Sequence, residues 1–123
     1  MRFALSVPVV GGGSTELQHV AFATRDVFAT AEAMRERGVP LLTVPGNYYD
    51  DLAARTQLAP DAIERMRELG VLYEPGERGE LLHFYTVMAS PSLFFEVLER
   101  RGGYDGYGAS NTPVRLAAQR QRD

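Results

Sequence analysis

The sequence contains no cysteine, and this absence excludes several kinds of chemistry. A chain without thiols forms no disulfide, carries no thiolate nucleophile, and holds neither zinc nor an iron–sulfur cluster through sulfur. Any metal ion must therefore be bound by histidine, aspartate or glutamate. Histidine is itself scarce, because the 123 residues include only His19 and His83.

Long apolar runs and a strong charge imbalance are also missing. No stretch approaches the ~18 consecutive apolar residues of a membrane span, and no basic segment followed by an apolar core suggests a signal peptide. The net charge of −3 gives no reason to expect capture of nucleic acid or of an anionic membrane. We therefore expect a single-domain cytoplasmic protein whose partners include neither nucleic acid nor membrane.

Apolar periodicity and turn residues predict an α+β fold. The expected order is a leading strand, a second strand, helices, three strands in quick succession and a final helix. The predicted strands cover residues 1–10, 17–24, 71–73, 80–87 and 93–99, and the short connections among the last three favour antiparallel pairing. The predicted helices run from a cap at Asp26 to 37, from 48 to 56 after a turn at 45–47, from Pro60 to Gly70, and over 113–121 after a cap at Asn111.

Strand alternation places an unusual carboxylate in the last strand. Glu96 shares a strand face with Phe94 and Leu98, in an apolar context. An ionised carboxylate there is costly unless a positive group pairs with it. The candidates are an arginine, a protonated histidine and a metal ion.

Both histidines also fall within predicted strands. Two histidines and one carboxylate form the facial ligand set of non-haem Fe(II) oxygenases, which leaves positions open for O₂ and a chelating substrate. The alternatives are a hydrogen-bonded core role for His19 and His83, an arginine partner for Glu96, and a core role for aromatic residues such as Tyr85 and Phe94.

Four segments resemble 4-hydroxyphenylpyruvate dioxygenase, in its order and at its spacing. An even closer resemblance is to the dioxygenase-like C-terminal domain of bacterial 3-dehydroshikimate dehydratase fusions. The resemblance implies a βαβββ module of the vicinal-oxygen-chelate type over residues 17–101, with the leading strand at 1–10 and a Gly-rich segment and lid helix at 102–123. The segments are LQHVAFATRDVF (17–28), PGNYYDDL (45–52), ELLHFYT (80–86) and FFEVLERRGGYDGYGASN (94–111).

The resemblance also implies site residues and a cofactor. His19 and Glu96 correspond to metal ligands, with Fe(II) as the expected ion and Zn, Mn or Co as alternatives. The expected ligand is a small 2-oxo acid or a related aromatic molecule. The residues expected to contact it are Gln18, His83, Tyr85, Phe94, Tyr107 and Asn111.

The sequence departs from the family pattern in ways that affect the site. The family's first metal-binding histidine belongs to an earlier module, so this chain supplies half of the usual domain. His83 stands where the family has Gln, so it could bind substrate or replace the missing ligand. Ser6 and Thr112 replace a substrate-binding Asn and a lid Phe, which puts the specificity for 4-hydroxyphenylpyruvate in doubt.

These departures leave two ways of completing the site and two candidate functions. A preceding module could supply the remaining ligand, or a homodimer could pair two copies of His19 and Glu96 into a four-ligand shell. The first function is a metal-dependent dioxygenase-like protein acting on a 2-oxo acid. The second is a non-catalytic ligand-binding or relic module of the same fold.

Overall fold

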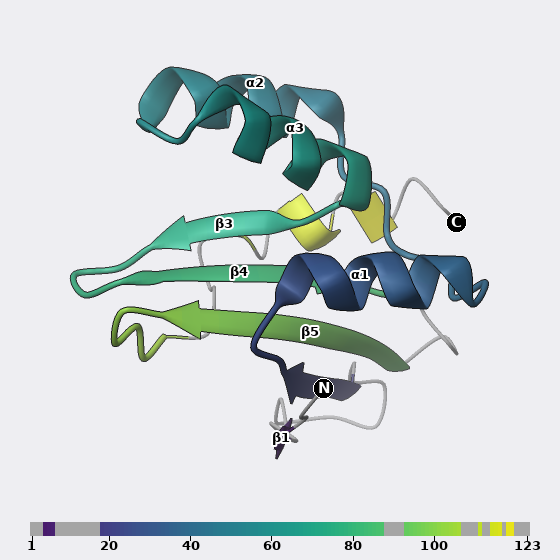
Figure 1. Ribbon diagram of the computed structural model, residues 1–123. Helices are drawn as coiled ribbons and strands as arrows, with labels where there is room; N and C mark the ends of the chain where they lie inside the picture. The colour runs from purple at the N-terminus through teal and green to yellow at the C-terminus, as the bar shows by residue number, and fades with distance from the viewer. Residues whose placement is uncertain are drawn as a thin grey trace.

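The chain folds around a five-stranded mixed sheet in the order β1-β2-β5-β4-β3 (Figure 1). The computed structural model describes residues 4–6, 18–87, 93–106, 111, 114–116 and 118–119, with side chains at all of these except 4–6, 18 and 19. The strands are β1 (Ala4–Ser6), β2 (Gln18–Ala23), β3 (Leu72–Pro75), β4 (Glu80–Tyr85) and β5 (Leu93–Arg101), and the helices are α1 (Val27–Glu36), α2 (Gly46–Arg55) and α3 (Pro60–Leu69).

The sheet topology confirms the predicted order of elements. Strands β3, β4 and β5 form consecutive antiparallel pairs, as their short connections predicted. Strand β2 pairs with β5 in parallel, and β1 adds to the outer side of β2 as the expected extra strand. Within the final predicted helix, the described residues 114–116 and 118–119 are helical. The remainder of that predicted helix lies outside the described residues.

The predicted helix ends of α1 and α3 are confirmed at the residues that signalled them. The Asp26 side chain accepts a hydrogen bond from the Ala29 backbone N–H at 3.1 Å, which satisfies an otherwise free donor of the first turn. Pro60 begins α3, where its missing N–H has no consequence. Gly70 ends α3 with a φ of 72°, a left-handed conformation that disfavours side chains.

The prediction for α2 was wrong at its start. The helix begins at Gly46, so the expected turn at 45–47 is its first turn. Asp50 and Asp51 therefore lie inside the helix and not at its beginning. Asp50 forms an ion pair with Arg67, and Asp51 forms one with Arg55, on the exposed surface. No turn signal in the sequence distinguishes such residues from those at the start of a helix.

Strand ends also differ from the prediction, and β3 and β5 run further because their pairing continues beyond the apolar pattern. Strand β5 continues to Arg101, whose partner across the ladder is Glu80. Its last residues are charged, so hydrophobic periodicity had placed the end at 99. Strand β4 ends at Tyr85, and the next residue forms an isolated bridge with Leu41. Strand β3 runs two residues beyond its predicted end, to Pro75.

The two faces of the sheet are covered by different parts of the chain. Helix α1 lies across one face (Figure 1), where Val27 and Ala31 join a core cluster with Phe84 and Val97. On the other face, the 111–119 region reaches β4 and β5 through Asn111, which contacts the His83 side chain. No helix in the described part of the chain is both long and apolar enough to cross a bilayer.

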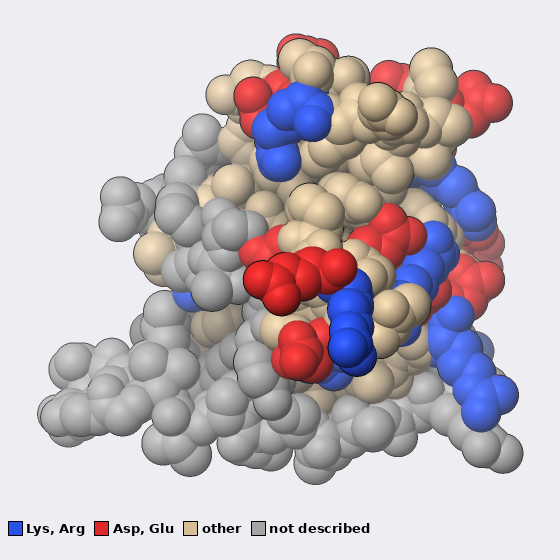
Figure 2. Space-filling view, turned by 90° about the vertical axis from the view of Figure 1, so that its left-hand side faces the viewer, with Lys and Arg blue, Asp and Glu red and all other residues tan. Residues whose placement is uncertain are grey.

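Charges on the flank of the sheet are mixed in sign. Figure 2 shows acidic and basic side chains interspersed on this face and not separated into single-sign patches. Arg101 accounts for part of the mixture, because it pairs with Glu80 and with Glu99. Such mixed surfaces exert little long-range attraction on charged partners.

A buried histidine–glutamate pair as the candidate site

The face opposite α1 brings together the residues that strand alternation had grouped. In the β4–β5 ladder, Tyr85 lies directly opposite Glu96, and His83 lies opposite Leu98. In the β2–β5 ladder, Ala21 aligns with Glu96 and His19 aligns with Phe94. Since paired residues share a sheet face, the register confirms that these positions belong to one face.

His83 and Glu96 form a direct contact at the centre of this face. The His83 Nδ1 atom lies 2.8 Å from Glu96 Oε2. The side chains of His83 and Glu96 are 0% and 1% exposed. Of the partners considered for the buried carboxylate, the structure therefore shows a histidine. Because both groups are shielded from water, removing either would leave the other with a large desolvation cost.

Asn111 defines the protonation pattern of the histidine. Its amide nitrogen lies 3.2 Å from the Tyr73 carbonyl and 2.9 Å from His83 Nε2. A carbonyl can only accept, so the amide nitrogen donates to it and also faces the ring. Nε2 therefore accepts, and Nδ1 carries the proton that His83 donates to Glu96.

The network continues to the edge of the sheet through Tyr48. The Tyr48 hydroxyl accepts from the Tyr73 N–H at 2.9 Å and lies 3.0 Å from the Tyr73 carbonyl, which satisfies both backbone groups of one residue in edge strand β3. It also lies 3.3 Å from Asn111 Oδ1. Burial raises the pKa of Tyr48, so it remains a neutral donor. Helix α2 is thereby connected to the buried pair.

Two aromatic rings lie beside the pair. The Tyr85 and Phe94 ring centres are 5.8 Å apart in an edge-to-face arrangement, and the Tyr85 ring lies 5.4 Å from the His83 ring. Burial raises the pKa of the Tyr85 hydroxyl, and the nearby Glu96 charge raises it further. Tyr85 therefore stays protonated and can donate a hydrogen bond.

An arginine from the C-terminal region covers these rings, and the sequence had not suggested it. The Arg115 guanidinium carbon lies 4.5 Å from the Phe94 ring centre and 5.8 Å from that of Tyr85. Arg115 also donates to Gln119 Oε1 at 3.0 Å. No role was predicted for the basic residues from 115 onward. The spacing of four between Arg115 and Gln119 was the available signal, because it places both on one side of a helix.

The remaining predicted site residues are described in part or not at all. For His19 and Gln18 the backbone is described, and Gln18 aligns with Leu93, a position of the face opposite that of Glu96. Their side chains, and the whole of Tyr107, lie outside the described residues. The roles expected for these three residues stay predictions.

The described residues contain no complete metal ligand set. Among them, no group of three or more His, Asp or Glu side chains could hold a metal ion. Glu96 and His83 are adjacent, but both His83 ring nitrogens have hydrogen-bond partners. The ligand role considered for His83 stays a prediction, and it would require exchange of one of these bonds.

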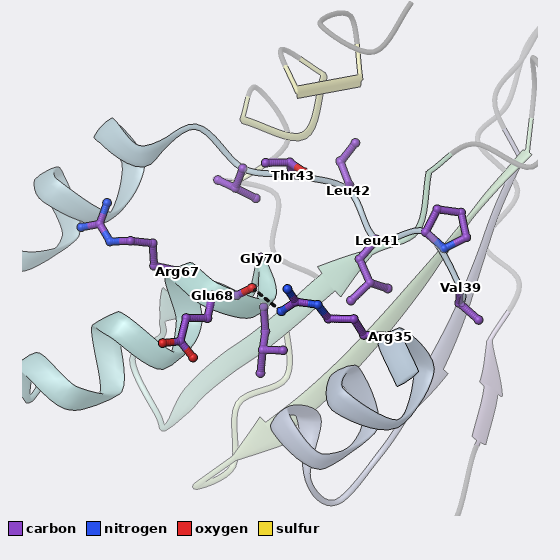
Figure 3. Close-up of a pocket in the computed structure, with 11 residues that line it drawn as sticks. Arg35, Val39, Leu41, Leu42, Thr43, Arg67, Glu68 and Gly70 are labelled. Carbon is purple, nitrogen blue, oxygen red and sulfur yellow. Dashed lines mark hydrogen bonds between the residues drawn. The ribbon is translucent and has the colours of Figure 1, made fainter. Parts of the chain in front are cut away.

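A cavity elsewhere does not coincide with this pair. It has a volume of about 290 Å³ and lies between the C-terminal ends of α1 and α3 and the segment that follows α1 (Figure 3). Arg35 donates to the Glu68 carbonyl across it at 3.1 Å. Its lining includes neither His83 nor Glu96, so it is distinct from the candidate site.

Similarity to known proteins connects the chain to two groups of proteins. The chain is 46% identical over 106 residues to a 3-dehydroshikimate dehydratase from Pseudomonas aeruginosa, which covers 85% of this chain and 17% of that protein. It is 34% identical over 97 residues to a 4-hydroxyphenylpyruvate dioxygenase from the same organism, which covers 77% of this chain and 27% of the relative. The chain thus spans about a sixth to about a quarter of the length of these curated relatives. No family model matches the sequence.

A solved structure shows the same architecture. A xylose isomerase-like TIM barrel/4-hydroxyphenylpyruvate dioxygenase fusion protein superposes with a TM-score of 0.82 at 43% identity, over 85% of this chain and 17% of that chain. At this identity the similarity extends beyond fold to common ancestry. It confirms the resemblance noted in the sequence and the predicted βαβββ architecture.

Proposed function

Because this chain belongs to the 4-hydroxyphenylpyruvate dioxygenase-like family of vicinal-oxygen-chelate modules, we propose that it forms part of a metal-dependent dioxygenase site for a 2-oxo acid. The observation that carries the proposal is the buried Glu96 carboxylate, 1% exposed, on a sheet face whose register includes the His19 position. A carboxylate is rarely buried at such a position without a positive partner or a metal ion.

The donor set fits a divalent cation in part. Glu96 offers an anionic oxygen, and His19 is expected to add an imidazole nitrogen from the adjacent strand. Fe(II) accepts such a mixed set, and Zn, Mn and Co accept similar ones. These two residues would hold the ion, and at least one further ligand is required. When bound, Fe(II) would supply O₂ activation and chelation of the 2-oxo acid.

The neighbouring residues have clear roles in this proposal. The His83 Nδ1–H holds one Glu96 oxygen at 2.8 Å, which orients the carboxylate that would bind the ion. Tyr85 and Phe94 form an apolar wall beside it. Asn111, which contacts His83, and Arg115, which lies over the Phe94 ring, would help to exclude water from this face. The expected contact of Tyr107 with the ligand belongs to the same proposal, and Gln18, whose strand position lies on the opposite sheet face, would have to reach the ligand from there.

The missing ligand would come from outside the chain. A preceding module is one source, and it is supported by the relatives, in which the matched region is a minor part of a longer protein. The other source is a second copy of this chain, because a homodimer would combine two His19–Glu96 pairs. Light scattering combined with metal analysis distinguishes these sources. A metal-loaded dimer indicates the second copy, and a monomer that binds metal only with an added module indicates the first.

The experiment for the proposed activity compares two buried glutamates of β5. Purified protein is loaded with Fe(II) without oxygen, mixed with 4-hydroxyphenylpyruvate, and observed for a metal-to-ligand absorption band and then for O₂ uptake. Glu96→Gln is expected to abolish both. Glu99→Gln is the matched control, because Glu99 is also buried but binds the Val27 N–H and Arg101. If the unaltered protein, with its partner module supplied, shows neither signal, the proposal is wrong.

A second candidate is a non-catalytic ligand-binding module. The hydrogen bonds at both nitrogens of His83 favour it, because they leave this residue committed to the fold. Binding of the 2-oxo acid without O₂ uptake, equally tight in the presence of a chelator, would support this function over the first.

A further inference from the structure

Arg115 and Gln119 form a polar pair on the aromatic wall of the candidate site. The Arg115 side chain is half-buried, and its guanidinium carbon lies 4.5 Å from the Phe94 ring centre, within the range of a cation–π contact. One edge nitrogen donates to Gln119 Oε1 at 3.0 Å. This bond fixes which end of the Gln119 amide faces the arginine.

The other end of the same amide has no partner. Gln119 is 6% exposed, and its Nε2 atom is the one buried side-chain nitrogen or oxygen among the described residues without a hydrogen bond. A buried donor without an acceptor is unfavourable, and folded proteins seldom keep one that has no further use. Arg115 orients this donor, so cationic and neutral N–H groups lie side by side.

The chemistry of this pair defines a ligand class. Both side chains present donors, and a guanidinium edge matches the two oxygens of a carboxylate. The only described acceptor of Arg115 is Gln119, and no ion pair joins Arg115 to an acidic residue of the described chain. The nearby Glu96 carboxylate is bonded to His83. Among the described residues Arg115 thus has no acidic partner, so an anion from outside them would match its charge.

We propose that Arg115 and Gln119 form a carboxylate-binding subsite against Phe94 and Tyr85, which recognises an organic acid without help from a metal ion. The ligand's carboxylate accepts from the free edge of the guanidinium and from Gln119 Nε2. Its apolar part lies beside the half-buried Arg115 side chain, over the buried rings of Phe94 and Tyr85. This subsite refines the proposed function, because it identifies residues that would select an acid as ligand, but it does not depend on metal binding.

The test uses benzoate and benzamide as probes, which share shape and differ in charge. Binding is measured by NMR titration of the whole protein in the presence of a chelator. Benzoate is expected to bind about tenfold or more tightly than benzamide, because hydrogen bonds to a charged group are the stronger ones. The chelator separates this test from the metal proposal, which can fail without affecting it.

The variants make the assignment specific to these two residues. Arg115→Gln is expected to remove the preference for benzoate, and Gln119→Leu to weaken benzoate binding several-fold without lowering Tm. Arg65→Gln is the matched control, because Arg65 also stacks on an aromatic ring, that of Phe28 at 4.7 Å, away from the site. Equal binding of the two probes, absence of benzoate binding, or an unchanged preference in Arg115→Gln would overturn the proposal.

Discussion

At the scale of single residues, His83 determines how the buried carboxylate is tolerated. It donates to Glu96 through Nδ1 and accepts from Asn111 through Nε2, so one ring satisfies two polar groups that water does not reach. The same arrangement makes His83 a structural partner of Glu96 whatever the site binds.

Replacing His83 with leucine should therefore destabilise the fold strongly. Glu96 and Asn111 would each lose a buried partner, and breaking such a pair costs about 3–5 kcal/mol. His83→Gln, which retains a donor and an acceptor, should lose about half as much. Urea unfolding of both variants measures the difference. A change of less than about 1 kcal/mol in His83→Leu would contradict this account of the pair.

Gln119 should show the opposite behaviour. Leucine at this position removes the unpaired donor while it keeps the apolar volume, so the free energy of unfolding should rise by about 1 kcal/mol. Urea unfolding measures it. A loss of stability of the same size would indicate that the Arg115–Gln119 hydrogen bond, which leucine also removes, outweighs the unpaired donor.

The sequence identified His83 and Glu96 as candidate site residues, but it did not predict that they contact each other. Alternation within each strand grouped His83 with Tyr85, and Glu96 with Phe94, and the sheet register confirmed that these groups share one face. The pairing of two strands cannot be read from the sequence of one strand. A histidine was therefore one of three partners considered for Glu96, and the structure shows the contact with His83 at 2.8 Å. Arg115 was missed because its role depends on the long-range packing of the 111–119 region against β4 and β5.

At the scale of elements, Tyr48 connects a helix to the exposed edge of the sheet. Its hydroxyl pairs with both the N–H and the carbonyl of Tyr73, which closes part of an edge that could otherwise pair with another chain. Helix α2 thus stabilises β3 without contributing a strand.

Tyr48→Phe should loosen the edge strand selectively. The loss of a buried hydroxyl with these bonds should cost about 1–3 kcal/mol, and the amide of Tyr73 should exchange faster with solvent deuterium. Tyr49→Phe is the control, because its hydroxyl donates instead to the Val71 carbonyl at 2.9 Å. Unchanged exchange at Tyr73 in Tyr48→Phe would rule out the capping role.

Element boundaries were predictable where local chemistry sets them. Asp26, Pro60 and Gly70 mark helix ends through caps and backbone conformation, and these signals act within a few residues. The start of α2 and the end of β5 depend on packing and on ladder partners, so local patterns misplaced them. Resemblance to known proteins supplied the architecture that local patterns left open.

At the scale of the whole molecule, buried tyrosines couple stability to alkaline pH. Burial raises the pKa of Tyr49 and Tyr85, and burial together with Glu80 raises that of Tyr73 to about 12. A phenol whose native pKa exceeds its unfolded value of about 10 contributes stability that is complete below about pH 10 and is lost as pH rises further.

The urea midpoint should consequently hold steady up to about pH 10 and fall above it. Absorbance at an ultraviolet wavelength sensitive to tyrosinate should show these phenols ionising only as the chain unfolds. Tyr85→Phe should reduce the alkaline loss. Ionisation of all tyrosines in the folded protein near about pH 10 would contradict the burial of these side chains.

The central claim is that Glu96 faces a cation shared with His19 and with a ligand from outside the chain. The most direct measurement is the dissociation constant for Fe(II), determined anaerobically for the unaltered protein with its partner module or as the assembled dimer, and for Glu96→Gln and Glu99→Gln. The account predicts one ion per completed site, lost in Glu96→Gln and retained in Glu99→Gln. Equal affinity in all three proteins, or no binding in any, would contradict it.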